Sequence, residues 1–95
     1  MRIAVLGAGA WGSALAISLS ARHQISLWSK DPDHATEMDS QRINQSFLPG
    51  YALPESLKIT STLNEALDVA DLALIVVPIA GLRETVRALS LIHIS

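Results

Sequence analysis

The 95-residue sequence has no cysteine and few aromatic side chains, with one Phe, one Tyr and two Trp. Without cysteine there is no disulfide scaffold, no thiolate metal site and no cysteine nucleophile. The sequence has seven Lys and Arg residues and nine Asp and Glu residues, so it has no excess of positive charge to attract nucleic acid or a membrane surface. The charge balance therefore predicts partners other than nucleic acid and membrane.

Long apolar runs are also missing. The longest, residues 72–77, is far shorter than the roughly 20 residues that cross a bilayer. The first residues lead directly into a structured segment, without the layout of a signal peptide. The composition is nonetheless 49% apolar, which favours a packed core over disorder. We expect a cytoplasmic chain of at most one globular domain.

Four short apolar segments predict β-strands. Residues 3–6 form a continuous apolar run that ends at Gly7, which is typical of a strand buried on both faces of a parallel sheet. The other predicted strands are residues 24–28, 57–61 and 72–77. Helical segments separate them. This alternation predicts an α/β fold with a Rossmann-type, doubly wound parallel sheet. The pattern is still in progress at residue 95, so we expect the sheet to be truncated.

The first two helices carry clear local signals. Trp11, Leu15 and Leu19 recur every four residues, with small residues alongside at Ala14, Ser18 and Ala21. This pattern predicts an amphipathic helix after the first strand, whose small residues would let it lie close to the sheet. Asp31 and Pro32 have the residue types of an N-cap and a first helical position, so they predict the start of a more polar helix after the second strand.

The rest of the chain predicts a loop and two more helices. Residues 44–56 contain two of the four prolines and are expected to form a loop. Thr62 with Glu65 three residues later fits a capping box, and predicts a short helix that ends near residue 69. A further helix is expected over residues 81–89.

A glycine motif connects the first strand to the first helix. Residues 7–12 read G-A-G-A-W-G, the spacing G-x-G-x-x-G. Gly7 would permit the tight turn, Gly9 would let the backbone approach a pyrophosphate, and Gly12 would let helix and sheet pack closely. The helix N-terminus would offer N–H groups to the phosphates. The motif predicts a dinucleotide site, with a simple turn that contains a packing glycine as the alternative.

Two side chains at this site allow more than one interpretation. Trp11 could pack as the first residue of the helix face, or its indole and backbone N–H could border the cofactor, and both can hold together. Lys30 follows Ser29 at the tip of the second strand, and the two could hold a ribose 2′-phosphate through an ammonium and a hydroxyl; alternatively Lys30 is a solvated surface residue. The first acid is Asp31, interpreted as a helix cap. The expected cofactor is NADP or NAD.

Other polar residues have weaker signals. Ser13 is expected to cap the first helix, and Arg83 and Arg87 to form a solvated face. Three histidines stand alone, without a carboxylate or second histidine at ligand spacing, so we expect surface or loop positions and no metal site. They are His23, His34 and His93.

Four sequence blocks resemble the bacterial NAD(P)-dependent glycerol-3-phosphate dehydrogenase family. They are residues 7–16, 27–32, 44–50 and 76–83, in the family's order. Trp11 within the glycine block and the Asn-x-x-Phe-Leu-Pro block at residues 44–49 make the resemblance specific. The alternatives are a related 6-phosphogluconate-type or hydroxyacyl-CoA-type dehydrogenase, and a non-catalytic module that senses nucleotides.

The resemblance implies a function and a set of contacts. It implies interconversion of dihydroxyacetone phosphate and sn-glycerol 3-phosphate for phospholipid synthesis, by a cytoplasmic enzyme that is a homodimer at full length. It assigns cofactor binding to the glycine turn, made of Gly7, Ala8, Gly9, Ala10, Trp11 and Gly12, and to Lys30 and Phe47. Ala10 departs from the family, which commonly has a serine there.

The resemblance also implies what these residues do not supply. The family's substrate-contacting and catalytic lysines match neither Lys30 nor Lys58, so we assign no catalytic residue and expect the chain alone to be inactive. Residues 1–88 resemble an incomplete N-terminal NAD(P)-binding domain. Residues 89–95 look like a translated sequencing adapter, with the start of a further strand at residues 91–94 as the alternative.

Overall fold

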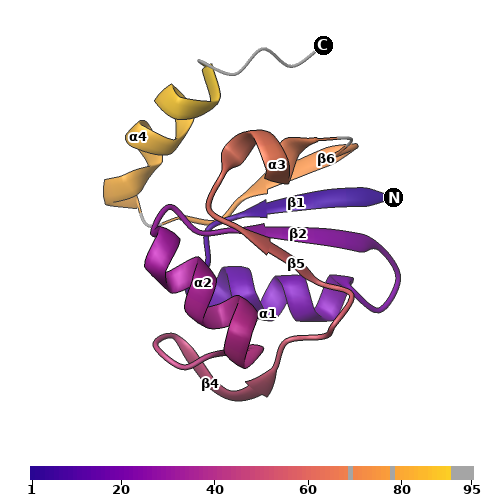
Figure 1. Ribbon diagram of the computed structural model, residues 1–95. Coiled ribbons are helices and arrows are strands. Elements are labelled where there is room, and N and C mark those ends of the chain that lie inside the picture. Colours follow the sequence, from indigo (N-terminus) through magenta and orange to yellow (C-terminus); the bar gives the residue numbers. More distant parts are fainter. Residues whose placement is uncertain (69, 78, 91–95) are drawn as a thin grey trace.

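A four-stranded parallel sheet runs through the computed structural model, which describes residues 1–68, 70–77 and 79–90 (Figure 1). The sheet has the order β5–β2–β1–β6. Its strands are β1 Arg2–Leu6, β2 Gln24–Trp28, β5 Lys58–Thr60 and β6 Leu72–Ile75. The chain builds outward from β1 through β2 to β5, then returns to add β6 on the other side of β1. The expected α/β Rossmann-type parallel sheet is confirmed.

Strand β1 is central and buried on both faces, as its apolar run predicted. Successive side chains of a strand point to opposite faces. Ile3 and Val5 accordingly belong to one hydrophobic cluster, and Ala4 and Leu6 to another. The sheet therefore separates two cores, and each needs a layer of helices to cover it.

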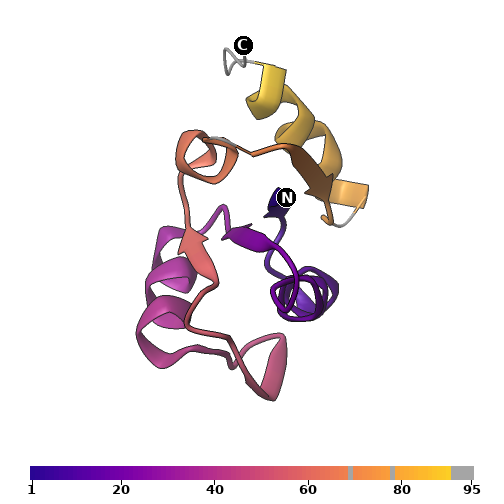
Figure 2. The same cartoon turned by 90° about the vertical axis from the view of Figure 1, so that its right-hand side faces the viewer.

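Helices cover both faces of the sheet (Figure 2). Helices α1 Ala10–Leu19 and α2 Pro32–Gln41 lie on one face, where Ala16 and Met38 join the cluster of Val5. Helices α3 Leu63–Leu67 and α4 Ile79–Ser90 lie on the other, where Ala66 and Leu89 pack with Leu6 and Trp28. Asp31 caps α2 through its carboxylate, as expected, accepting from the N–H of Asp33 at 3.0 Å.

The predicted helix α1 is present and lies close to the sheet, but its three large apolar residues do not share a buried face. Trp11 is 78% exposed and Leu15 is 37% exposed, whereas Gly12, Ser13 and Ala16 are buried. The fully buried positions of the helix are small residues, which lets it lie close to the sheet, and Ile17 and Leu19 pack against the same core while partly exposed. The spacing of large apolar residues therefore located the helix but not the face that packs on the sheet.

The predicted loop over residues 44–56 contains a small antiparallel pair. Strand β3 Ile43–Asn44 pairs with β4 Leu48–Ala52. The chain enters it through Arg42, which ends α2 with a left-handed φ of 55°. The Arg42 guanidinium donates to the carbonyls of Pro54 and Leu57, so it ties the end of α2 to the segment that leads into β5.

The predicted capping box of α3 is also wrong. Thr62 occupies the N-cap position, but its side chain makes no capping bond. The hydroxyl of Thr60 instead accepts from the Thr62 N–H at 3.1 Å and donates to Glu65 at 2.8 Å. Thr60 ends β5, so the helix start is fixed from the neighbouring strand. Helix α3 ends at Leu67, whereas the expected end near residue 69 lies outside the described residues.

The last elements differ from expectation in their bounds. Strand β6 stops two residues short of the predicted 72–77 segment, and α4 begins earlier than residue 81 and continues to Ser90. Residues 91–95 lie outside the described part, and with them most of the predicted tail, the alternative strand and His93. In the ranges that the structure describes, no helix combines the length and the apolar character needed to cross a bilayer.

Candidate functional site

The glycine turn lies where β1 ends and α1 begins, at the carboxyl edge of the sheet. Gly7 has a φ of 130°, a conformation that a residue with a Cβ rarely adopts. Its N–H donates to the Trp28 carbonyl at 3.0 Å, which joins the ends of β1 and β2. On the other side of β1, the Val76 N–H donates to the Leu6 carbonyl at 2.8 Å. The turn thus sits at the switch point between β2 and β6, where open α/β sheets bind ligands.

Two of the glycines are required by the protein itself. A Cβ on Gly7 would lie 2.0 Å from the Val76 carbonyl oxygen. A Cβ on Gly12 would lie 1.7 Å from the Gly7 carbonyl oxygen. Both obstacles are backbone atoms, which cannot move aside as a flexible side chain can. The alternative of a turn with a packing glycine therefore accounts for Gly7 and Gly12.

Gly9 is different, because nothing in the described chain demands a glycine there. Its φ of −78° and ψ of −165° are ordinary for any L-residue. A Cβ built on Gly9 meets no atom within 4 Å. The space that glycine leaves open faces away from the protein, which is the property expected where a ligand approaches the backbone.

Helix α1 begins beside Gly9 with backbone N–H groups that have no partner among the residues the structure describes. The Ser13 N–H donates to the Gly9 carbonyl at 3.0 Å, the first bond of the helix, so the N–H groups of Ala10, Trp11 and Gly12 precede the hydrogen-bond ladder. The first turn of α1 contains no acidic side chain. An anion placed here would meet N–H donors and the positive end of the helix dipole.

Trp11 projects into solvent from this first turn, with 78% of its surface exposed. It does not pack on the buried face of the helix, and its place beside the cofactor stays a prediction. The side chain of Ala10 is exposed next to it.

At the tip of β2, Ser29 and Lys30 have different surroundings. Ser29 is 5% exposed, and its hydroxyl accepts from the Asp31 N–H at 3.3 Å and lies 3.3 Å from Nδ1 of His34. The hydroxyl is therefore engaged within the protein, contrary to the expectation that it could hold a 2′-phosphate. Lys30 is exposed beside it.

Sequence reasoning missed a buried polar cluster below the turn. Asn44 has no exposed surface, and its amide nitrogen lies 2.8 Å from both the Ala8 carbonyl and the Ser13 hydroxyl. Ser13 is thus held by Asn44 and does not cap α1, which corrects that prediction. His34 was expected at the surface or in a loop, but it lies half-buried in α2, 2.9 Å from Asn44.

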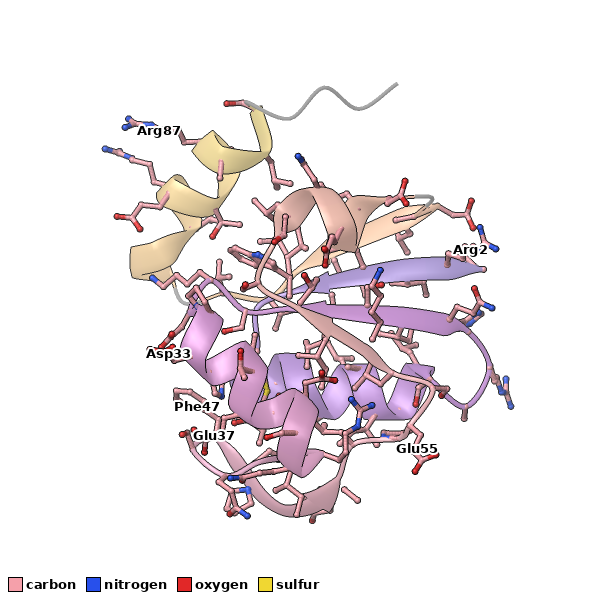
Figure 3. The ribbon with its side chains drawn as sticks, in the orientation of Figure 1. Arg2, Asp33, Glu37, Phe47, Glu55 and Arg87 are labelled. Atoms are coloured by element: carbon pink, nitrogen blue, oxygen red, sulfur yellow. The ribbon has the colours of Figure 1, made fainter. Side chains whose placement is uncertain are left out.

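Phe47 follows Asn44 at the same edge. Its ring is 54% exposed, and its N–H donates to the Asn44 side-chain oxygen at 3.3 Å. Figure 3 shows Phe47 beside α2, at the end of the molecule away from Arg2. The fold thus gathers the glycine turn, the β2 tip that carries Lys30, and Phe47 on one edge.

Two other regions lie away from this edge. Arg83 and Arg87 are exposed on α4, as expected. A polar groove lies at the amino ends of the strands, lined by residues that include Arg2, His23 and Asp71. Ligands of open α/β sheets bind at the carboxyl ends, so this groove is not the candidate site.

A parallel sheet in this order, with a glycine turn at its switch point and a helix N-terminus behind it, defines a Rossmann-type dinucleotide-binding domain. Residues 2–93 match the model of the NAD-dependent glycerol-3-phosphate dehydrogenase N-terminus, and the chain belongs to this family.

Similar proteins carry the same family name. Glycerol-3-phosphate dehydrogenase [NAD(P)+] from Nitrosomonas eutropha is 50% identical over 93 residues, which are 98% of this chain and 28% of the relative. The corresponding protein of Nitrosomonas europaea is 54% identical over 87 residues, 92% of this chain and 26% of the relative. This chain therefore spans little more than a quarter of the length of these relatives.

Solved structures agree in fold. The crystal structure of glycerol-3-phosphate dehydrogenase from Coxiella burnetii superposes with a TM-score of 0.89 at 40% identity, covering 98% of this chain and 29% of that one. The Plasmodium falciparum glycerol-3-phosphate dehydrogenase gives a TM-score of 0.88 at 22% identity, over all of this chain and 29% of that one, and supports the fold alone.

Proposed function

We propose that this chain binds NADP(H) or NAD(H) and is the cofactor-binding part of a glycerol-3-phosphate dehydrogenase. The observation that carries the proposal is Gly9. It has an ordinary backbone conformation and open space at its Cβ position, directly before the free N–H groups of α1. A glycine that the protein itself does not require fits the close approach of a diphosphate. Family membership supplies the reaction class.

Each part of the site has a proposed task. The N–H groups at the start of α1 hold the diphosphate, which the Gly7–Gly12 turn lets come close. Lys30 places a positive charge at the tip of β2, where Rossmann-type domains bind the ribose, so it would favour a 2′-phosphate. The exposed rings of Trp11 and Phe47 give the bound nucleotide apolar neighbours and reduce its contact with water. The residues present therefore suit either NADP or NAD.

The reaction proposed for the parent enzyme is reduction of dihydroxyacetone phosphate to sn-glycerol 3-phosphate, and its reverse. The nicotinamide, when bound, supplies the hydride that forms the new C–H bond at the carbonyl carbon. A proton joins the carbonyl oxygen, and we propose that its donor lies outside these 95 residues. The chain alone is therefore expected to bind the cofactor without turning over substrate. The proposal places the parent enzyme in the cytoplasm as a homodimer that supplies phospholipid synthesis.

Binding and catalysis are tested separately. Titration of the 95-residue chain with NADPH and with NADH should change the fluorescence of Trp11, which stands at the site. An unchanged signal, together with no heat on mixing in calorimetry, would refute nucleotide binding.

The protein encoded by the complete gene around this segment tests the reaction. It should oxidise NADPH or NADH when dihydroxyacetone phosphate is added, and the 95-residue chain should not. Activity on 6-phosphogluconate or a hydroxyacyl-CoA, with none on dihydroxyacetone phosphate, would assign the chain to a different dehydrogenase.

A further inference from the structure

The side chain of Asn44 connects three segments at the carboxyl edge of the sheet. Its Nδ2 donates to the Ala8 carbonyl and to the Ser13 hydroxyl, each at 2.8 Å. Its Oδ1 accepts from the Phe47 N–H at 3.3 Å and lies 2.9 Å from Nε2 of His34. All of this occurs with no exposed surface on Asn44.

The polarity of these partners fixes the orientation of the amide. The Ala8 carbonyl can only accept and the Phe47 N–H can only donate, so Nδ2 must face Ala8 and Oδ1 must face Phe47. Oδ1 is an acceptor, and therefore Nε2 of His34 carries a hydrogen and donates it. The opposite nitrogen, Nδ1, lies 3.3 Å from the Ser29 hydroxyl.

The Asn44 amide is hydrogen-bonded to both ends of the segment that would face the diphosphate. Ala8 immediately precedes Gly9, and Ser13 is the first residue whose N–H bonds within α1. The free N–H groups proposed to hold the phosphates lie between these two attachment points. An amide that fixes Ala8 and Ser13 together therefore fixes the direction of those donors.

His34 extends this connection to the other half of the site. Its ring reaches Ser29, the residue before Lys30, and meets the Phe47 ring edge-on with centroids 5.5 Å apart. Helix α2, which carries His34, is in turn fixed by the Asp31 cap. One continuous chain of contacts thus runs from the glycine turn through Asn44 and His34 to the β2 tip.

We propose that Asn44 is a positioning residue of the dinucleotide site, and that His34 relays its effect to the β2 tip. Asn44 holds the glycine turn in the shape that accepts the diphosphate. The inference rests on the proposed nucleotide binding. A buried amide that satisfies four groups is costly to remove, because each partner is left without its hydrogen bond.

The test measures nucleotide affinity of the 95-residue chain at a temperature where every variant is folded, with thermal unfolding recorded separately. Asn44→Ala should lower the affinity for NADPH and for NADH by the same factor, about tenfold, because the diphosphate is common to both. The matched control is Gln45→Ala, which removes an amide side chain from the exposed neighbouring position and should leave both affinities unchanged.

Milder variants keep the test valid if Asn44→Ala does not fold. Ser13→Ala removes one of the two groups that accept hydrogen bonds from Nδ2 of Asn44. It should lower the affinity for both nucleotides about threefold. His34→Leu should have an effect of similar size, and His34→Gln, which retains an N–H donor, should restore most of the affinity. A structural role alone would lower the unfolding temperature without changing the affinity of the folded protein.

Two failures are distinguishable. If the unmodified chain binds neither NADPH nor NADH, the proposed function fails. If the unmodified chain binds and Asn44→Ala, or Ser13→Ala where the former does not fold, binds equally well, the positioning role of Asn44 is overturned and the proposed function stands.

Discussion

Replacing Gly9 with alanine adds a methyl group where the protein has room for it. No heavy atom lies within 4 Å of the added Cβ, and the backbone is in a region open to alanine. Alanine is a poorer N-cap than glycine, by about 0.5 kcal/mol or somewhat more. The reduced freedom of the unfolded chain offsets this by about 0.4–1 kcal/mol. The free energy of unfolding should therefore change by less than about 0.5 kcal/mol.

The same methyl group should strongly affect nucleotide binding. If the diphosphate approaches the backbone at Gly9, the Cβ occupies the space that the ligand needs. Overpacking of a tight contact costs about 1–3 kcal/mol, so affinity for NADPH and NADH should fall by about fivefold to a hundredfold. Both nucleotides should be affected equally, because the obstacle lies at the diphosphate.

Gly12→Ala is the contrasting variant. Its Cβ would lie 1.7 Å from the Gly7 carbonyl oxygen, so helix α1 must move away from the sheet. We expect the free energy of unfolding to fall by more than about 3 kcal/mol, which is a large part of the stability of a small domain. One glycine thus serves the ligand and the other serves the fold.

Urea unfolding followed by circular dichroism and fluorescence titration with both nucleotides separate the two effects. Gly9→Ala should unfold like the unmodified chain and bind weakly, whereas Gly12→Ala should unfold at much lower urea. Undiminished binding by a folded Gly9→Ala variant would show that the space at Gly9 is not the diphosphate site. A large stability loss in that variant would contradict the reasoning from open space.

Three further predictions concern single side chains. Lys30→Ala should lower affinity for NADPH about tenfold relative to NADH, with the difference shrinking at high salt; equal losses for both nucleotides would count against a 2′-phosphate contact. Asp31→Ala should reduce the free energy of unfolding by about 1 kcal/mol while Asp31→Asn retains it, as measured in urea; equal losses would contradict the cap. Trp11→Phe should leave stability within about 0.5 kcal/mol and shift tryptophan emission to the blue, because Trp28 is only 6% exposed; an unshifted spectrum would contradict the exposure of Trp11.

The site was predictable wherever its signals are local. Asp31 and Pro32 predicted the start of α2 because capping involves only the next few residues. The glycine spacing located the turn because a left-handed φ at Gly7 is a property of one residue. The predicted cap by Thr62 was wrong although its signal was local, because the hydroxyl of Thr60, at the end of a strand, bonds the residues at the start of α3 instead.

The Asn44 cluster could not be predicted in this way. Asn44 and Ala8 are 36 residues apart, and neither carries a local sign of the other. His34 stood alone in the sequence because its partner Asn44 lies ten residues further along, beyond the end of its own helix. The Asn-x-x-Phe-Leu-Pro block drew attention to this segment through a family resemblance, which assigned a role to Phe47 and none to Asn44.

By itself, the sequence determined the alternation of strands and helices, the buried centre at β1 and the place of the glycine turn. These follow from side-chain periodicity and from the backbone freedom of single residues, which any fold must respect. Tertiary structure alone decided which face of α1 packs, which glycine is left open to a ligand, and what Asn44 holds. Those outcomes depend on the distance between α1 and the sheet and on partners brought together from distant parts of the chain.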